Sequence, residues 1–173
     1  MEHYKNIKEI HERMVGGYIS KRFKHHVFSY GWDSHLAQLV TGISIKRGNN
    51  RIKNYVIADE LERVTERVTE EKDFSLRFGV EKTGRGNFGK MRGDFCLLGA
   101  SYSKKVLTLH YRSLELMGGL VYDQAILGYV IAWLGIKVKK VVCMCASCHS
   151  FALKGNSNEK LWEQLQKVYA DYE

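Results

Sequence analysis

The stretch LTLHYRSLELMGGLVYD, residues 107–123, joins a predicted strand to a predicted buried helix. Its first residues continue an alternation of apolar and polar positions from 106 to 111, which is typical of a strand with one buried face. An apolar run from Phe95 to Tyr102 precedes it, across a turn at residues 103–105. The pattern predicts an antiparallel β-hairpin that ends at Arg112-Ser113.

The other end of the stretch leads into a helix that is apolar on nearly every side, predicted over residues 123–134. Such a helix runs through the middle of a core, and it is too short and too polar at its start to cross a bilayer. Asp123 is placed as its N-cap and Gly135 as its stop signal. With a buried strand over 141–146 and a final amphipathic helix around Leu161, the chain is expected to be α+β, a mixed sheet packed with helices.

Shorter elements are predicted on either side. Residues 4–15 have helical spacing, residues 34–40 predict another short helix, and Ile43 and Ile45 alternate with polar residues as in a strand. Residues 76–94 hold five glycines among basic residues and match no phosphate-binding motif, so an irregular loop is expected. A single domain is therefore expected over residues 1–173, with an N-terminal helical and basic region before residue 41.

The charge balance favours anionic partners. The chain has 27 Lys and Arg against 19 Asp and Glu, a net charge of +8 in 173 residues. Nucleotide phosphates, nucleic acid and acidic surfaces all fit this charge. The basic segment Lys21–His26 is expected to be a solvated face or a phosphate contact. The N-terminus has no apolar region typical of a secretory signal, so a cytoplasmic protein without a membrane partner is expected.

Three cysteines and a histidine lie within seven positions, as Cys143, Cys145, Cys148 and His149. The last three match the C-x-x-C-H pattern of covalent haem attachment, and the four together could bind a metal. Haem attachment of this kind belongs to exported proteins, and a zinc site needs a second ligand pair, whereas the only other cysteine is Cys96. The thiols are therefore expected to be buried in a strand, with no haem and no metal.

The helix predicted over residues 54–70 has the clearest periodicity in the sequence, with an apolar stripe at Ile57, Leu61, Val64 and Val68. Glu60 lies at the edge of this buried stripe. Two interpretations stay open for this residue: a partly shielded surface carboxylate, or a carboxylate in a cleft, where desolvation would favour proton transfer.

Together these segments resemble the thymidylate synthase superfamily, which includes the deoxycytidylate hydroxymethylases. In that family a strand ends in Tyr-x-Arg-Ser, and an acid, a glycine and a pyrimidine-reading Asn or Asp follow. The matching residues here are Arg112, Ser113, Glu115, Gly119 and Asp123. Asn54 to Leu61 is similar to the segment that carries the family's catalytic glutamate, and His149-Ser150-Phe151 is similar to its His-x-Tyr.

The resemblance implies a thymidylate synthase-like core over residues 41–168, a homodimer, and a role for each matching residue. Arg112 and Ser113 would hold the 5′-phosphate of a pyrimidine deoxynucleoside monophosphate. His149 would contact the sugar, although Phe151 lacks the hydroxyl of the family's tyrosine. Glu60 would organise water and proton transfer, and Glu115 would meet the cofactor, 5,10-methylene-tetrahydrofolate. Asp123 would read the base edge, and an ionised carboxylate there favours dCMP over dUMP.

The family's nucleophile is a cysteine thiolate located before the hairpin. Aligned without gaps from Arg112, that position is Arg92, and the nearest thiol, Cys96, lies four residues further on. Cys96 could act only if the hairpin were shorter than in the family. Two functions stay open: a C5-methyl- or hydroxymethyltransferase, or a catalytically inactive relative that binds a nucleotide, nucleic acid or a protein partner.

Overall fold

The computed structural model describes residues 1–15, 21–46, 61–66, 73–77, 96–150 and 157–172. Within these residues the chain is mixed α/β, with seven strands in one mixed, open sheet. The strands are β1 (Glu2–Tyr4), β2 (Lys21–Gly31), β3 (Phe74–Arg77), β4 (Leu97–Ser103), β5 (Val106–Tyr111), β6 (Leu114–Glu115) and β7 (Lys140–Ser150). Their order is β1-β2-β7-β5-β4-β3, and β6 pairs with the end of β7.

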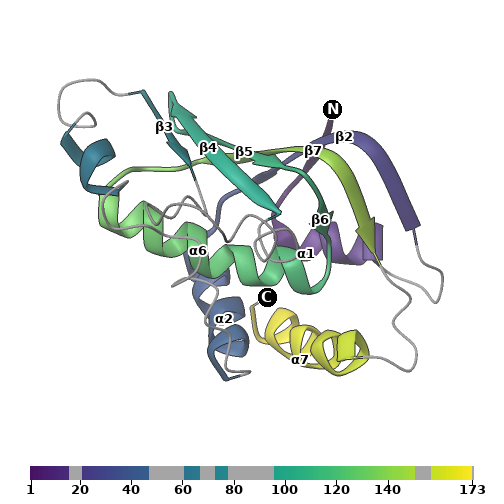
Figure 1. The fold of residues 1–173 in the computed structure, drawn as a ribbon. Helices are drawn as coiled ribbons and strands as arrows, with labels where there is room; N and C mark the ends of the chain where they lie inside the picture. The colour runs from purple at the N-terminus through teal and green to yellow at the C-terminus, as the bar shows by residue number, and fades with distance from the viewer. Residues whose placement is uncertain (16–20, 47–60, 67–72, 78–95, 151–156, 173) are drawn as a thin grey trace, which may run out of the picture.

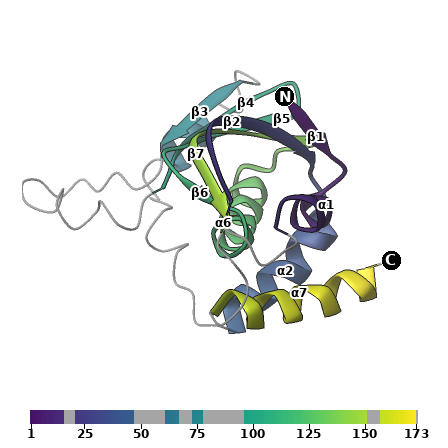
Figure 2. The ribbon, with the colours of Figure 1, turned by 90° about the vertical axis from the view of Figure 1, so that its right-hand side faces the viewer.

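The helices of the described residues lie on one side of this sheet (Figure 1). They are α1 (Ile7–Ile10), which continues into a π-helical turn (His11–Val15), α2 (Ser34–Lys46), α6 (Gly118–Leu134) and α7 (Ser157–Tyr172), with a further helical segment at 61–66. The sheet arches over α6 (Figure 2). No helix in the described part of the chain is long and apolar enough to cross a membrane.

The predicted hairpin is confirmed as β4 and β5, with pairs from Ser103–Val106 to Leu97–Tyr111. Its turn consists of Lys104 and Lys105, whose φ angles are 50° and 68°. A two-residue turn with both φ angles positive matches the right-handed twist of the flanking strands. Leu107, Leu109 and Tyr111 of β5 are buried, as the alternation predicts.

The buried central helix is confirmed as α6 and begins at Gly118, five residues before the expected start. Its hydrophobic residues pack against the inner face of the sheet: Leu120, Val121, Ile126, Leu127 and Val130 are all nearly inaccessible. Gly135 ends the helix with a left-handed φ of 62°, as expected of this stop signal. The N-cap prediction for Asp123 is wrong, because the cap residue is Met117 and Asp123 lies within the helix.

Three other expectations are wrong in part. α2 continues to Lys46, so Ile43 and Ile45 are helical; Leu36, Val40 and Ile43 are buried at helical spacing. The helix expected over 4–15 covers 7–15 only, since residues 2–4 form β1. Of the loop expected over 76–94, Leu76 and Arg77 belong to β3, and the remainder lies outside the described residues.

The N-terminal forty residues contribute to the same sheet as the rest of the chain. The basic segment that begins at Lys21 is the first half of β2, which pairs antiparallel with β7 along its length. Phe28 and Tyr30 of β2 join the core cluster that contains Leu109 and Val141. Residues 1–40 therefore supply an inner strand and part of the core.

Candidate functional site

Cys96 and Arg112 lie side by side at the open end of the β4–β5 hairpin. The backbone N–H of Arg112 donates to the carbonyl of Cys96 over 2.9 Å, which extends the ladder one residue beyond the Leu97–Tyr111 pair. The guanidinium Nη2 lies 3.9 Å from the Cys96 sulfur. Cys96 is partly exposed and Arg112 is exposed, so a thiol and a cation share one surface.

His149 adjoins this pair through β6. In the parallel β6–β7 ladder Glu115 pairs with His149, and the N–H of Leu116 donates to the His149 carbonyl over 2.8 Å. The Ser113 hydroxyl lies 3.4 Å from His149 Nδ1. Because Ser113 follows Arg112 directly, the fold brings Cys96, Arg112, Ser113 and His149 together from three separate segments.

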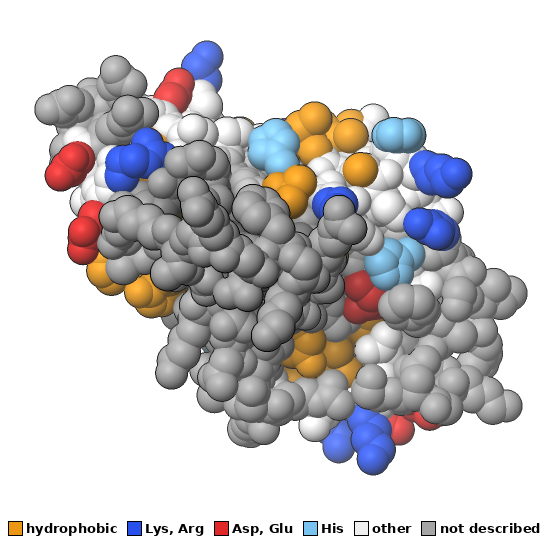
Figure 3. All heavy atoms as spheres, viewed as in Figure 1, with side chains coloured by type: hydrophobic (Ala, Val, Ile, Leu, Met, Phe, Trp, Pro, Cys, Tyr) orange, Lys and Arg blue, Asp and Glu red, His pale blue; other side chains and the backbone are white. Residues whose placement is uncertain are grey.

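Basic residues of β2 extend the same region. Arg22 pairs with His149 across the β2–β7 ladder, and directly paired residues of neighbouring strands lie on the same face. Arg22 and Lys24 are both exposed. Lys, Arg and His side chains gather over the ends of β2 and β7 (Figure 3). The sequence marked residues 21–26 as basic, but only the pairing with residues 145–150 shows which of them reaches His149.

Glu115 is engaged by the start of α6. Its carboxylate accepts hydrogen bonds from the N–H groups of Met117, Gly118 and Gly119, two of them over 3.0 Å. These donors have no partner within the helix, and the positive end of the helix dipole favours a carboxylate at this position. The carboxylate thus serves as the helix cap that sequence patterning assigned to Asp123.

Asp123 lies beneath the sheet. Its side chain is only 4% exposed and accepts a hydrogen bond from the Tyr111 hydroxyl over 2.9 Å. Burial, together with the nearby charge of Asp123, raises the pKa of Tyr111 well above its usual value. Tyr111 points inward and the next residue, Arg112, is exposed, so Asp123 is not gathered with the exposed cations. Its expected contact with a base edge stays a prediction.

The three clustered thiols are buried in β7, as expected. Burial raises the pKa of Cys143, and contact with the Cys145 thiol together with burial raises that of Cys148. The described residues contain no group of three or more side chains suited to hold a metal ion. The strand is not buried throughout, however, because Met144 and Ala146 lie exposed on the outer face.

Glu60, Arg92 and Phe151 lie outside the described residues. The geometry described above is therefore that of a thiol and a hydroxyl beside a histidine and two arginines.

The chain matches no protein-family model, and a search of curated proteins finds no match.

Proposed function

We propose that this protein is a pyrimidine deoxynucleotide C5-methyl- or hydroxymethyltransferase that acts on dCMP or dUMP with 5,10-methylene-tetrahydrofolate. The observation that carries the proposal is the position of Cys96 beside Arg112. The resemblance to the thymidylate synthase superfamily requires a thiol before the hairpin, and Cys96 lies directly before β4, beside the arginine that follows β5. The two-residue turn keeps the hairpin short, which supports this role for Cys96.

The cationic groups around His149 support binding of a 5′-phosphate. Arg112 and Arg22 offer planar donor sets, and Ser113, which follows Arg112, and His149, which pairs with Arg22, add a hydroxyl and a ring nitrogen. Guanidinium groups bind phosphate oxygens through paired, charge-assisted hydrogen bonds. A nucleotide held in this way would extend its sugar and base toward Cys96, which adjoins Arg112.

The chemistry follows from the thiol. The Cys96 thiolate would add to C6 of the pyrimidine, and the electron pair released at C5 would attack the one-carbon unit that the folate supplies. Loss of the C5 proton with release of the folate amine would leave an exocyclic methylene at C5, and addition of water, or of a hydride from the tetrahydrofolate, which becomes dihydrofolate, would then expel the thiolate and give the hydroxymethyl or methyl product. Arg112 would hold the phosphate and place a positive charge beside the attacking sulfur.

The base preference depends on Asp123. An ionised carboxylate accepts hydrogen bonds and does not donate them, which suits the amino group of cytosine. Tyr111 already donates to Asp123 Oδ2, so the hydroxyl and the carboxylate would read the base as one unit. This assignment requires the base to reach the inner side of β5, where Asp123 lies.

A homodimer through the outer face of the sheet belongs to the same proposal. Leu98 is 51% and Met144 44% exposed on this face. His110 pairs with Met144 on one side and with Gly99, next to Leu98, on the other, so Leu98 and Met144 flank His110 in a row across β4, β5 and β7. No helix of the described residues covers this face (Figures 1 and 2).

The alternative is a protein that binds a nucleotide or nucleic acid without catalysis. The basic residues Arg22 and Lys24 favour it, because an exposed cationic strand suits a phosphate backbone. The hydrogen bonds of Glu115 also favour the binding protein. Three backbone N–H groups already donate to the carboxylate that the resemblance assigns to folate contact.

Covalent trapping separates the two functions. The protein is incubated with the 5-fluoro derivative of dUMP or dCMP and methylene-tetrahydrofolate, and its intact mass is measured. The transferase forms a stable adduct that Cys96→Ser abolishes and that Cys145→Ala, which removes a buried thiol, retains. Nucleotide binding without an adduct in the wild type would reject the transferase and support the binding protein.

A further inference from the structure

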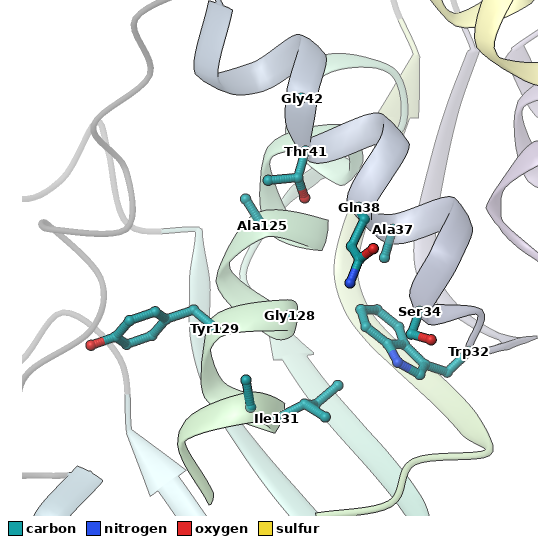
Figure 4. Close-up of a pocket in the computed structure, with 11 residues that line it drawn as sticks. Trp32, Ser34, Ala37, Gln38, Thr41, Gly42, Ala125, Gly128, Tyr129 and Ile131 are labelled. Atoms are coloured by element: carbon teal, nitrogen blue, oxygen red, sulfur yellow. The ribbon is translucent and has the colours of Figure 1, made fainter. Parts of the chain in front are cut away.

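A pocket of about 480 Å³ lies between α2 and the C-terminal half of α6, away from the helix start that Glu115 caps. Its walls include Ala37, Gln38 and Thr41 of α2 and Ala125 and Gly128 of α6, with Trp32 at one end (Figure 4). The volume falls within the range of sites that hold small organic molecules. None of the residues of the thiol and arginine site lines it.

Two glycines keep this space open. Gly42 and Gly128 lie inside their helices, and a Cβ atom added to either would meet no atom within 4 Å. Glycine is less favourable than alanine within a helix, and it is usually found there where two helix backbones come too close for a side chain. The backbones do not come that close at Gly42 or Gly128. The helices could carry larger side chains at both positions, and the pocket would then be filled.

The lining selects for an uncharged molecule. Charged residues make up 27% of the chain, yet none of the described residues that line the pocket is charged. The α2 wall offers polar groups, since Gln38 and Thr41 point into the space between the helices (Figure 4), and the α6 wall offers mainly apolar groups. A charged ligand would lose hydration there without finding a counter-charge.

Trp32 and Gln38 favour a flat ligand with a polar edge. The indole ring lies beside the Gln38 carboxamide at one end of the pocket (Figure 4). A flat aromatic ring stacks favourably on an indole face. A carboxamide presents a donor and an acceptor side by side, which matches a heteroaromatic edge that carries an acceptor next to a donor.

We propose that the pocket between α2 and α6 binds an uncharged, flat heteroaromatic molecule with a neighbouring donor and acceptor, of the class of a free purine base. The ring stacks on Trp32 and Gln38 reads its edge. The pocket is separate from the phosphate site proposed around Arg112, and its described lining residues offer no cation to a nucleotide phosphate.

Binding of adenine to the chain of residues 1–173 tests the proposal, measured by calorimetric titration and ligand-observed NMR. Gly128→Leu is expected to weaken adenine binding at least tenfold and to leave the melting temperature unchanged or higher, because leucine favours a helix and meets no neighbour at its Cβ. Gln38→Leu is expected to weaken adenine binding at least fivefold and to leave binding of indole, which lacks the acceptor, unchanged.

Two controls locate the binding. Trp133→Ala removes an exposed aromatic side chain of α6 that does not line the pocket, and Arg112→Ala alters the phosphate site. Both are expected to bind adenine as the wild type does. No adenine binding by the wild type, binding that survives Gly128→Leu, or binding that is lost in Arg112→Ala would overturn the proposal.

Discussion

The backbone N–H of Arg112 donates to the carbonyl of Cys96 over 2.9 Å, and this bond lies one residue beyond the last pair of the β4–β5 ladder. Sixteen residues separate the two in sequence. A two-residue turn at Lys104-Lys105 and a register shift between Leu97 and Gly99 together set this pairing, so a change in either would move Cys96 relative to Arg112. The proposed chemistry therefore depends on the turn as well as on the two side chains.

Arg112 and Arg22 are expected to act together on a nucleotide phosphate. Arg112→Ala should weaken binding of dCMP at least tenfold, because it removes a charge-assisted contact. Arg22→Ala should weaken it by a smaller factor, since Arg22 reaches the site only beside His149. Calorimetric titration at fixed salt measures both, and Lys137→Ala, an exposed cation elsewhere, is the matched control. Unchanged affinity in Arg112→Ala would contradict the phosphate assignment.

The turn offers a test of the register. Lys104 and Lys105 adopt left-handed φ angles of 50° and 68°, which non-glycine residues adopt at a cost. Replacing the pair by Asn-Gly, the preferred sequence of such turns, should stabilise the protein by roughly 1 kcal/mol. Urea unfolding measures the change. Lys139→Gly, at an exposed position without a positive φ, should destabilise instead. A loss of stability in the Asn-Gly variant would mean that the turn differs from the one described.

Local periodicity predicted the hairpin and α6, because alternation over 106–111 and an all-round apolar run over 123–134 are each sufficient to define an element. The same periodicity predicted a strand at Ile43 and Ile45, which are helical, because β-branched residues two positions apart are typical of a strand. Their place in α2 follows from the buried series Leu36, Val40 and Ile43 at spacings of four and three. The helical spacing that runs into Ile43 from the preceding residues outweighed the two-residue alternation.

The site was predictable only in part. Arg112-Ser113 and His149 were identified from order and spacing, and the structure brings Ser113 and His149 within 3.4 Å. The position of Arg22 was not predictable, because its partner His149 is more than a hundred residues away and no local signal encodes that pairing. The cap role of Glu115 was missed because its carboxylate reaches the helix from a strand, outside the usual N-cap position.

Glu115 is expected to matter for stability. Glu115→Ala should lower the free energy of unfolding by about 1 kcal/mol, because three amides at the start of α6 lose their acceptor. Glu115→Gln keeps an acceptor oxygen and should cost less. Denaturant unfolding of the two variants beside the wild type measures the effect. An unchanged stability in Glu115→Ala, with a loss of folate-dependent activity, would instead support the cofactor contact that the resemblance implies.

If the protein dimerises through the outer face of the sheet, a single charge placed on that face should separate the dimer. Met144→Lys places a cation in the centre of the row formed by Leu98, His110 and Met144, where burial in a dimer would oppose it. Sedimentation velocity should show a dimer for the wild type and a monomer for the variant. Trp133→Lys, also on an exposed aromatic position but on α6, should leave the dimer intact. A monomeric wild type at micromolar concentration would contradict the dimer.

His11 is expected to make stability depend on pH. It is fully buried, and its Nε2–H donates to the Leu116 carbonyl over 2.8 Å while the Tyr169 hydroxyl donates to Nδ1. Burial lowers its pKa from 6.5 to about 4, and the Leu116 bond offsets this in part. The unfolded chain therefore takes up the proton first. This contribution to the free energy of unfolding is fully present above pH 6.5 and should fall by up to about 3 kcal/mol as the pH drops from 6.5 to 4.

Urea unfolding at several pH values measures the loss that His11 causes. The His11→Gln variant should show a smaller dependence of the unfolding free energy on pH, whereas His35→Gln, at an exposed position, should leave the dependence unchanged. An equally steep loss in His11→Gln would assign the pH dependence to other groups.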